Sequence, residues 1–527
     1  MAVTRVLGIE GTAWAASAAV HETATDSLFV ETEAYEPESG GIHPREAAEH
    51  MRSAIPAVIE TALAAAEGPI DAVAFSRGPG LGPCLRIVGT AARALAGRLD
   101  VPLVGVNHMI AHLEIGRHRS GFASPVCLNA SGANAHVLGF RNGRYRVLGE
   151  TMDTGVGNAI DKFTRHVGWS HPGGPKVEEA ANDGSYLELP YVVKGMDFSF
   201  SGITSAARDA IDDGAAVEDV SKGLQETVFA MLTEVAERAL SVTGRDELVL
   251  GGGVGQNERL REMLGTMASQ RGADFYAPEP HLLRDNAGMI AVLGATMAEA
   301  GDTLAIEDSA VDPDFRPDEV PVTWRSAEAP PRRETEAAFA GAEAVVEFRD
   351  DRVDKIRRAK EYRHPELDER LRRERTVQEA RLTHEARRQG VPTPVIYDVD
   401  LAETTLTFER VGDRDLRDAL TPERAASVGR YLAAIHEAGF VHGDPTVRNV
   451  RVGNGDPETA LIDFGLGYWT DDVEDYAMDL HVFEQSLAGT ADEPDQYAEA
   501  AEAAYVTASG DTVIERLRKI EGRGRYQ

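Results

Sequence analysis

Lysine is nearly absent from this sequence of 527 residues: only seven of its 54 basic residues are lysines, and the others are arginines. Aspartate and glutamate together number 87, so the net charge at pH 7 is −33. Such a carboxylate-rich surface indicates adaptation to high salt, because self-repulsion is screened within a Debye length of about 3 Å at 1 M. Any contact with a nucleic acid must therefore come from local patches of arginine.

Cysteine and long apolar runs are also scarce. Cys84 and Cys127 are the only cysteines, which argues against a disulfide framework and a cysteine-bound metal and indicates a reducing, cytoplasmic location. No apolar run approaches membrane-spanning length, so we expect no membrane partner. Met1 leads almost directly into an apolar strand at residues 5–9, so we expect no signal peptide.

The length predicts two or three domains, because single cores stop growing at about 250–300 residues. The composition changes after Asp302, and prolines interrupt residues 308–321 and 329–333. We place a linker at residues 326–334, between a first domain of residues 1–325 and a second of residues 335–527.

Two stretches of the first domain share one pattern. Residues 6–20 and residues 126–140 each read as a strand, a glycine turn and a second strand. Helical patterns and further strands follow both stretches. We therefore predict a duplicated α/β fold with a cleft between its halves.

Glycine-rich turns follow several of these strands. The turn at residues 251–257 leads into the helix predicted from Glu258, an arrangement that suits an anion or a nucleotide. Glu10-Gly11-Thr12 can present backbone N–H groups to a phosphate, or form an ordinary hairpin turn.

His108 and His112 lie four residues apart in a predicted helix, and therefore on one face. Two imidazoles so placed can bind one metal ion, or they are two unrelated polar residues. Met109 follows His108, so the glutamate that serves as general base in a His-Glu-x-x-His zinc protease is absent.

Seven motifs then occur in one order and carry a resemblance. They are His108-Met-Ile-Ala-His112, Ser131-Gly132-Ala133-Asn134, Asp161-Lys162, residues 171–178 (HPGGPKVE), residues 198–202 (FSFSG), residues 251–257 (GGGVGQN) and residues 285–290 (DNAGMI). Over roughly residues 3–325 the chain resembles the universal tRNA threonylcarbamoyladenosine transferases, a branch of the actin, sugar-kinase and chaperone-ATPase superfamily. The resemblance implies an actin-like α/β fold of two similar halves.

It also implies the site residues. A divalent metal, Fe(2+) in this family, would be held by His108, His112 and Asp285, with Asn129 completing the site. Threonylcarbamoyl-adenylate would bind residues from two parts of the cleft: Asn129, Ala130, Ser131, Gly132 and Ala133, and then Asp161, Gly174, Glu178 and Asn257. The family's reaction transfers the threonylcarbamoyl group to N6 of the adenosine beside the anticodon, in tRNAs that read codons beginning with adenine, and releases AMP.

Two positions depart from the family pattern. Asn129 stands where the family has tyrosine, and Ala133 where it has glycine. The shorter Asn129 can still offer a carbonyl oxygen, whereas Ala133 adds a methyl group to a turn that can require positive φ.

Simpler roles remain open for single residues. Asp161 could cap or pair within its helix, Glu178 could be an exposed helix charge, and Asp285 could be the N-cap of the helix predicted for residues 287–298. His136 and His171 are expected not to be ligands.

The second domain carries a protein-kinase constellation. Lys355, Glu379, Asp444, Asn449 and Asp463 follow one another in the order that phosphoryl transfer requires. The lysine would bind phosphates and pair with the glutamate. Asp444 would position the hydroxyl, while Asn449 and Asp463 would hold Mg(2+).

Residues 355–368 (KIRRAKEYRHPELD) and His442-Gly443-Asp444 give this domain a close resemblance to the small atypical kinase of the KEOPS complex. The resemblance covers about residues 335–527 and implies a two-lobed α+β fold that binds ATP, with Gly341 and Ala342 in a reduced glycine loop. Lys360 competes with Lys355 for the phosphate role, and we favour Lys355 because Lys360 is expected to be solvated. Some archaea fuse this kinase to the transferase in this order, which, with the salt adaptation, indicates a halophilic archaeal source.

The sequence thus predicts a bifunctional tRNA-modifying enzyme: a threonylcarbamoyltransferase joined to a serine/threonine-protein kinase or ATPase. Its expected partners are tRNA, threonylcarbamoyl-adenylate, ATP and other KEOPS subunits. The alternatives are a metalloprotease and a non-catalytic scaffold that only binds ATP.

Overall fold

The computed structural model describes residues 3–35, 42–141, 143–326, 339–340, 343–453 and 458–521. Its first five-stranded sheet has the order β3-β2-β1-β4-β5. The strands are β1 (Arg5–Glu10), β2 (Ala15–Glu22), β3 (Ser27–Ala34), β4 (Ala72–Gly78) and β5 (Leu103–Asn107). One core beside this sheet is built with α1 (Pro44–Ala65) and α2 (Gly82–Leu99), and another with α3 (His108–Ser120) and α10 (Ala287–Glu299).

A second sheet repeats this topology. Its order is β12-β11-β6-β7-β8, and its strands are β6 (Val126–Ala130), β7 (Ala135–Arg141), β8 (Arg144–Glu150), β11 (Glu247–Gly251) and β12 (Asp274–Tyr276). As in the first sheet, the first three strands are antiparallel neighbours and the last two are parallel additions. The predicted duplicated α/β fold is confirmed.

Further helices complete the second half. They are α4 (Val156–His166), α5 (Gly174–Asp183), α6 (Ser201–Asp212), α7 (Val217–Thr243), α8 (Glu258–Arg271) and the short α9 (Pro280–Leu283). The strands β9 (Val193–Lys194) and β10 (Asp197–Phe198) form a small hairpin before α6.

The C-terminal part has two lobes. One contains the antiparallel sheet of β13 (Phe339–Ala340), β14 (Val345–Phe348), β15 (Arg352–Ile356), β17 (Thr405–Glu409) and β16 (Ile396–Asp400), together with α11 (Pro365–Arg388). The other is mainly helical, with α12 (Pro422–Glu437), α13 (Val473–Thr490), α14 (Pro494–Ser509) and α15 (Thr512–Glu521). Two small sheets accompany these helices: β18 (Arg414–Asp415), β20 (Val450–Val452) and β21 (Thr459–Leu461) form one, and β19 (Phe440–Val441) and β22 (Tyr468–Trp469) form the other. Gly341 and Ala342 lie outside the described residues.

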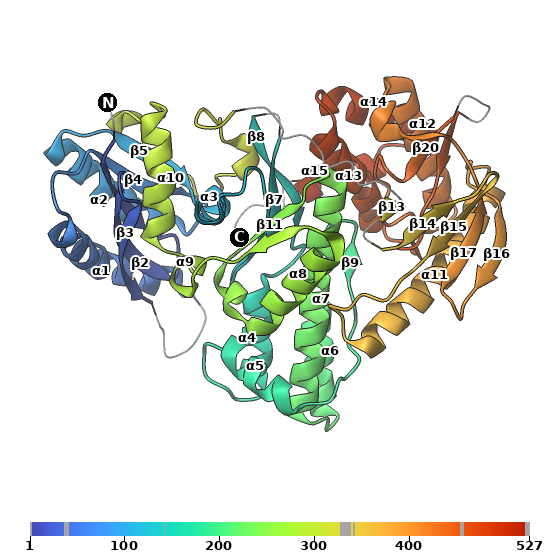
Figure 1. The fold of residues 1–527 in the computed structure, drawn as a ribbon, viewed down its shortest axis with the longest axis horizontal. Helices are drawn as coiled ribbons and strands as arrows, with labels where there is room; N and C mark the ends of the chain where they lie inside the picture. Colours follow the sequence, from blue (N-terminus) through green and yellow to red (C-terminus); the bar gives the residue numbers. More distant parts are fainter. Residues whose placement is uncertain are drawn as a thin grey trace.

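Helix α7 stands at the centre of the molecule, between the second sheet and the C-terminal part (Figure 1). Twenty of its 27 residues are buried, including Glu226, Glu234, Glu237 and Arg238. These charged side chains are paired: Glu226 and Glu237 with arginines of α8, and Glu234 and Glu237 with basic residues of the C-terminal part.

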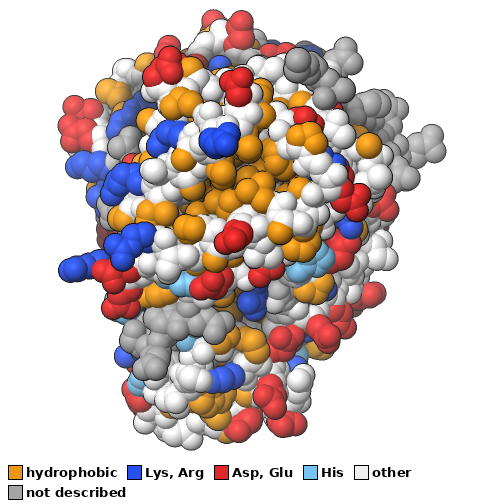
Figure 2. All heavy atoms as spheres, turned by 90° about the vertical axis from the view of Figure 1, so that its left-hand side faces the viewer, with side chains coloured by type: hydrophobic (Ala, Val, Ile, Leu, Met, Phe, Trp, Pro, Cys, Tyr) orange, Lys and Arg blue, Asp and Glu red, His pale blue; other side chains and the backbone are white. Residues whose placement is uncertain are grey.

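The surface is less uniform than the net charge suggests. Figure 2 shows the face at the left of Figure 1, where hydrophobic side chains gather in a patch with Lys and Arg on one side and Asp and Glu around it. Across the described residues, no helix is both long enough and apolar enough to cross a membrane.

Candidate functional site

Helix α3 brings the two predicted histidine ligands into the cleft. The helix starts directly after β5, and the Asn107 side chain caps it by accepting hydrogen bonds from the N–H groups of Met109 (3.0 Å) and Ile110 (3.1 Å). His108 and His112 therefore occupy its first turns, on the side that faces the segment before α10.

Asp285 meets both imidazoles. Its Oδ1 lies 3.4 Å from His108 Nε2 and 3.3 Å from His112 Nε2. The N-cap of α10 is Asn286, whose side chain accepts from Met289 N–H at 3.1 Å. The capping role that the sequence left open for Asp285 is therefore wrong, and its carboxylate is free to face the histidines.

Burial and charge oppose one another at these groups. Burial acts to lower the pKa of His108, but the carboxylates of Glu10 and Asp285 raise this pKa to about 10. For His112, burial dominates and lowers the pKa. The buried carboxylate of Glu10 and the partly buried one of Asp285, beside two imidazoles, leave a negative site that a divalent cation would neutralise.

The role of Glu10 is not apparent from the sequence. Its side chain is completely buried; Oε2 lies 3.1 Å from His108 Nδ1, and Oε1 accepts from Thr12 N–H at 2.7 Å. A carboxylate on the far nitrogen fixes the orientation of an imidazole and makes it a better metal ligand. The sequence shows a glutamate at the end of an apolar strand, but this local pattern predicts only a turn and not a contact with His108.

Asn129 lies on β6 beside the glycine turn and His112. Its Nδ2 lies 3.3 Å from His136 Nε2, while its Oδ1 is buried and has no hydrogen-bond partner among the described residues. At Gly252 (φ +85°), a Cβ atom would lie 2.5 Å from this Oδ1. The glycine thus leaves room for an orphaned oxygen that can accept from a ligand or bind a metal. Burial lowers the pKa of His136 to about 3, so this imidazole is neutral.

The predicted loop at residues 131–134 closes on itself. Ser131 Oγ donates to the carbonyl of Asn134 (2.8 Å), and the carbonyl of Gly132 accepts from Asn158 N–H (2.9 Å). Ala133, the departure from the family pattern, lies outside the left-handed region of backbone space. Its methyl group is therefore accommodated without backbone strain.

Asp161 and Glu178 hold neighbouring backbone in place. Asp161 Oδ1 accepts from Gly173 N–H at 2.9 Å, and Glu178 Oε1 accepts from the N–H of Glu258 at 2.8 Å. Glu178 is therefore not a free helix charge, because it satisfies the first N–H of α8 beside the glycine turn. Asn257 caps the same helix by accepting from Leu260 N–H, and donates to Gln225 on α7 at 3.2 Å.

An aromatic contact joins the two halves near this cluster. The indole of Trp14 stacks on the imidazole of His171 with centroids 5.2 Å apart, and His171 Nδ1 lies 3.3 Å from Asp161 Oδ2. Gly174, at the start of α5, has open space where a side chain would be. The predicted substrate residues thus border a region that reaches from one half to the other.

In the C-terminal part, Lys355 pairs with Glu379, as the sequence predicts, and also with Asp463, which the sequence predicts as a magnesium ligand. Lys355 Nζ lies 2.9 Å from Glu379 Oε1 and 2.6 Å from Asp463 Oδ1. Asp463 has φ +68°, a strained left-handed conformation for a non-glycine residue that occurs typically at functional sites.

The predicted catalytic residue Asp444 accepts a hydrogen bond from Asn449 Nδ2, with 3.0 Å between Nδ2 and Oδ2. Burial, reinforced by Asp463 and Glu343, raises the pKa of Asp444 to about 7.

Lys360 does not behave as the sequence predicted. Its Nζ lies 2.6 Å from Glu237 Oε1 on α7, so it is a half-buried ion-pair partner instead of a solvated lysine. The contact depends on a helix more than 100 residues earlier, which no local pattern reveals. It leaves Lys355 as the lysine that faces the pocket.

These kinase-like residues line a cavity of about 260 Å³, and α7 forms one of its walls. Arg238, Ser241 and Val242 reach it from the end of α7, with Met196 from the β9–β10 hairpin. The side of the pocket near Asp444 thus borders on the N-terminal part.

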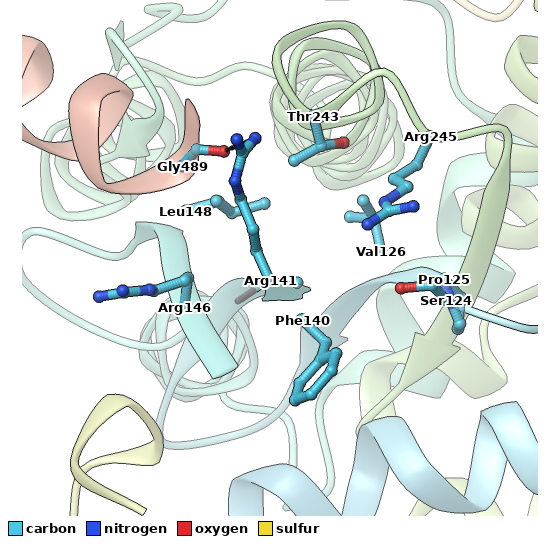
Figure 3. Close-up of a pocket in the computed structure, with 11 residues that line it drawn as sticks. Ser124, Pro125, Val126, Phe140, Arg141, Arg146, Leu148, Thr243, Arg245 and Gly489 are labelled. Carbon is cyan, nitrogen blue, oxygen red and sulfur yellow. Dashed lines mark hydrogen bonds between the residues drawn. The ribbon is translucent and has the colours of Figure 1, made fainter. Parts of the chain in front are cut away.

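A smaller hollow lies between the second sheet and the ends of α7 and α13 (Figure 3). There the guanidinium of Arg141 on β7 donates to the carbonyl of Gly489 on α13 at 2.9 Å and also to Thr490. Arg141 therefore fastens the second sheet to the helical lobe.

The comparisons with known proteins agree with this architecture. The model of the tRNA N6-adenosine threonylcarbamoyltransferase family matches residues 26–292, and that of the phosphotransferase enzyme family matches residues 437–518. A probable bifunctional tRNA threonylcarbamoyladenosine biosynthesis protein of Halobacterium salinarum is 71% identical, over 99% of each chain.

The chain belongs to the bifunctional tRNA threonylcarbamoyladenosine biosynthesis family.

Two other relatives have the same name. One from Haloarcula marismortui is 68% identical, over 99% of this chain and all of its own, and one from Methanospirillum hungatei is 52% identical over the whole of both. The predicted transferase and the halophilic archaeal relationship are thus confirmed. For the second predicted activity, the comparisons show only a kinase-like domain of the phosphotransferase family.

Proposed function

We propose that residues 1–325 transfer the threonylcarbamoyl group from threonylcarbamoyl-adenylate to N6 of the adenosine beside the anticodon, in tRNAs reading codons that begin with adenine. One observation carries the proposal. The Nε2 atoms of His108 and His112 on α3 both lie close to one carboxylate oxygen of Asp285, although Asp285 is some 170 residues away in the sequence. Around this cluster lie the loop at residues 131–134 and the glycine turn at residues 251–257.

The residues fit a divalent metal such as Fe(2+). Two imidazoles and one carboxylate, with the orphaned Oδ1 of Asn129 nearby, form a nitrogen and oxygen donor set that leaves positions open. The metal would supply Lewis-acid polarisation of an acyl oxygen. Glu10 holds the His108 ring in orientation through Nδ1.

The other residues of the site would position the substrate. Asp161, Gly174, Glu178 and Asn257 would bind the adenylate, where the two carboxylates already accept from backbone N–H groups at the helix starts. The attacking group is the adenosine amine and AMP leaves, so the reaction requires no protein nucleophile. Proximity and orientation then account for a large part of the rate enhancement.

The test is mass spectrometry of tRNA nucleosides after reaction with threonylcarbamoyl-adenylate. We expect His112→Ala and Asp285→Ala to lower AMP release and adenosine modification at least about 100-fold, as loss of an essential metal ligand does. His166→Ala is the control, since His166 pairs with the exposed Asp212 on the second half, outside the metal cluster. Peptide cleavage by the purified protein that His112→Ala abolishes would instead favour a metalloprotease.

We further propose that residues 335–527, joined through a linker at residues 326–334, bind ATP and Mg(2+) and act as an ATPase more than as a serine/threonine-protein kinase. Lys355 would bind phosphates, Glu379 would orient it, and Asn449 and Asp463 would hold Mg(2+), with Gly341 and Ala342 near the nucleotide. The support is the wall formed by α7, which occupies space beside Asp444 where a protein phosphoacceptor would have to approach. Other KEOPS subunits are the expected partners.

Measuring phosphate release and tRNA modification on the same variants tests this second proposal. We expect Asp444→Ala to lower ATP hydrolysis at least about 100-fold and to reduce the yield of multiple-turnover tRNA modification. Asp418→Ala, at an exposed aspartate outside the pocket, is the control. If Asp444→Ala leaves tRNA modification intact while Lys355→Met disrupts the complex, the domain is an ATP-binding scaffold.

A further inference from the structure

A second cluster of potential metal ligands lies at the opposite end of α3 from His108. His21 is on β2, Asp26 is in the turn between β2 and β3, and His118 is in the last turn of α3. Asp26 Oδ1 lies 3.1 Å from His21 Nε2 and 2.7 Å from His118 Nε2. One ligand atom of each residue lies within 4.8 Å of the others.

The geometry resembles a coordination sphere more than a single ion pair. Two imidazole nitrogens converge on the same carboxylate oxygen, and their rings meet edge to face at 6.0 Å. In a tetrahedral site with bonds of about 2.0–2.1 Å, neighbouring ligand atoms lie about 3.4 Å apart. Small side-chain movements would bring these three atoms to such spacing.

His21 is the buried member of the cluster, with 4% of its surface exposed. Its Nε2 is aimed at the cluster, and its Nδ1 has no hydrogen-bond partner among the described residues. Burial lowers the pKa of His21, although Asp26 opposes this effect.

Asp26 is held in place by the backbone and by its neighbours. Its φ of +52° belongs to the left-handed region, which is uncommon outside glycine and fixes the direction of the side chain in the turn. Arg119 Nη1 lies 3.8 Å from the other carboxylate oxygen, Oδ2, while Arg119 Nη2 pairs with Glu279 at 2.9 Å. Asp26 Oδ1 is therefore the oxygen that faces the two histidines.

We propose that His21, Asp26 and His118 form a second divalent-metal site, separate from the cluster at His108, His112 and Asp285. Two imidazoles and one carboxylate favour ions of the zinc type, namely Zn(2+), Co(2+), Ni(2+) or Cu(2+), over Mg(2+) and Ca(2+). The side chain of Asp26 is 50% exposed and that of His118 34%, so water completes the coordination. The bound ion ties the β2–β3 turn to the C-terminal end of α3, the helix that begins at His108.

The site is tested by metal titration of the full chain, after chelator treatment, in 1 M KCl with excess Mg(2+) to mask surface carboxylates. We expect two equivalents of Co(2+), detected by its visible absorption, and a rise in Tm on adding Zn(2+). His118→Ala and Asp26→Asn should each remove one equivalent and the corresponding part of the Tm shift. Both positions are exposed enough for the variants to fold, and a Tm measured without metal checks this.

His166→Ala is the matched control, since His166 also pairs with an exposed aspartate, at 2.8 Å, but has no second histidine there. It should keep both equivalents. A wild-type stoichiometry of one, or two equivalents retained by His118→Ala, would overturn the proposal. The other equivalent should disappear with His112→Ala, so failure of this site and failure of the transferase site give different results.

Discussion

Asp197 is a single buried carboxyl group that links pH to stability. Burial, reinforced by the neighbouring Glu150, raises its pKa to about 8, although it accepts a hydrogen bond from Glu150 N–H at 2.8 Å. It lies at the junction between the two parts, with Oδ2 4.0 Å from His481 on α13. The folded protein therefore retains a proton at this position that the unfolded chain releases near pH 4.

Because the folded pKa lies above the unfolded one, this residue contributes most to stability at acid pH, and the contribution is lost as pH rises from about 4 to about 8. Asp197→Asn stays neutral throughout. We expect the variant to be more stable than the wild type at pH 9 by a few kcal/mol, at about 1.4 kcal/mol per pKa unit, and the advantage to shrink as the pH falls to 5 and to vanish only near pH 4. Thermal unfolding between pH 5 and pH 9 at constant KCl measures it; identical profiles would contradict the assignment.

At the scale of an element, α7 is held by a buried ionic cluster. Glu234 lies 2.6 Å from Arg363 and 3.0 Å from Arg375, both of the C-terminal part, and also pairs with Arg238 on its own helix. Burial opposes the charge of Glu234, but the three arginines lower its pKa to about 2. The helix that lines the kinase-like pocket is therefore fixed by charges from both parts.

Glu234→Gln removes the carboxylate that the three buried arginines share, and leaves Arg238 and Arg375 with Glu343 and Arg363 with Asp368. We expect a loss of about 3–5 kcal/mol in the free energy of unfolding, as for other broken buried pairs. Glu188→Gln is the control, because Glu188 is 65% exposed in its pair with Arg370 and should cost about 0–1 kcal/mol. Urea unfolding in KCl compares them, and equal losses would show that α7 is held by its apolar contacts alone.

At the scale of the whole molecule, the net charge of −33 sets the conditions for folding. Unscreened carboxylates repel one another in the compact state, and salt shortens the range of this repulsion from about 10 Å at 0.1 M to about 3 Å at 1 M. We expect the Tm to rise steeply between 0.1 M and 2 M KCl. An uncharged osmolyte added in place of KCl should raise the Tm little, because it does not screen charge. Full stability at 0.1 M KCl would contradict adaptation to salt.

Much of this architecture could be predicted from local patterns. The strand-turn-strand repeats at residues 6–20 and 126–140 predicted two similar halves, because the period of two and the glycine turns are local properties of the chain. The spacing of His108 and His112 and the order Lys355, Glu379, Asp444, Asn449, Asp463 were equally visible, since helical periodicity and motif order need no tertiary information.

By itself, then, the sequence determined the family, the repeated α/β fold and the residue types at both sites. Only the tertiary structure decided how distant segments use their charges: Glu10 supports His108, and Lys360 pairs with Glu237. Those roles depend on which buried charges become neighbours. Burial makes such pairings strong, and sequence separations of up to 123 residues leave them no local signature.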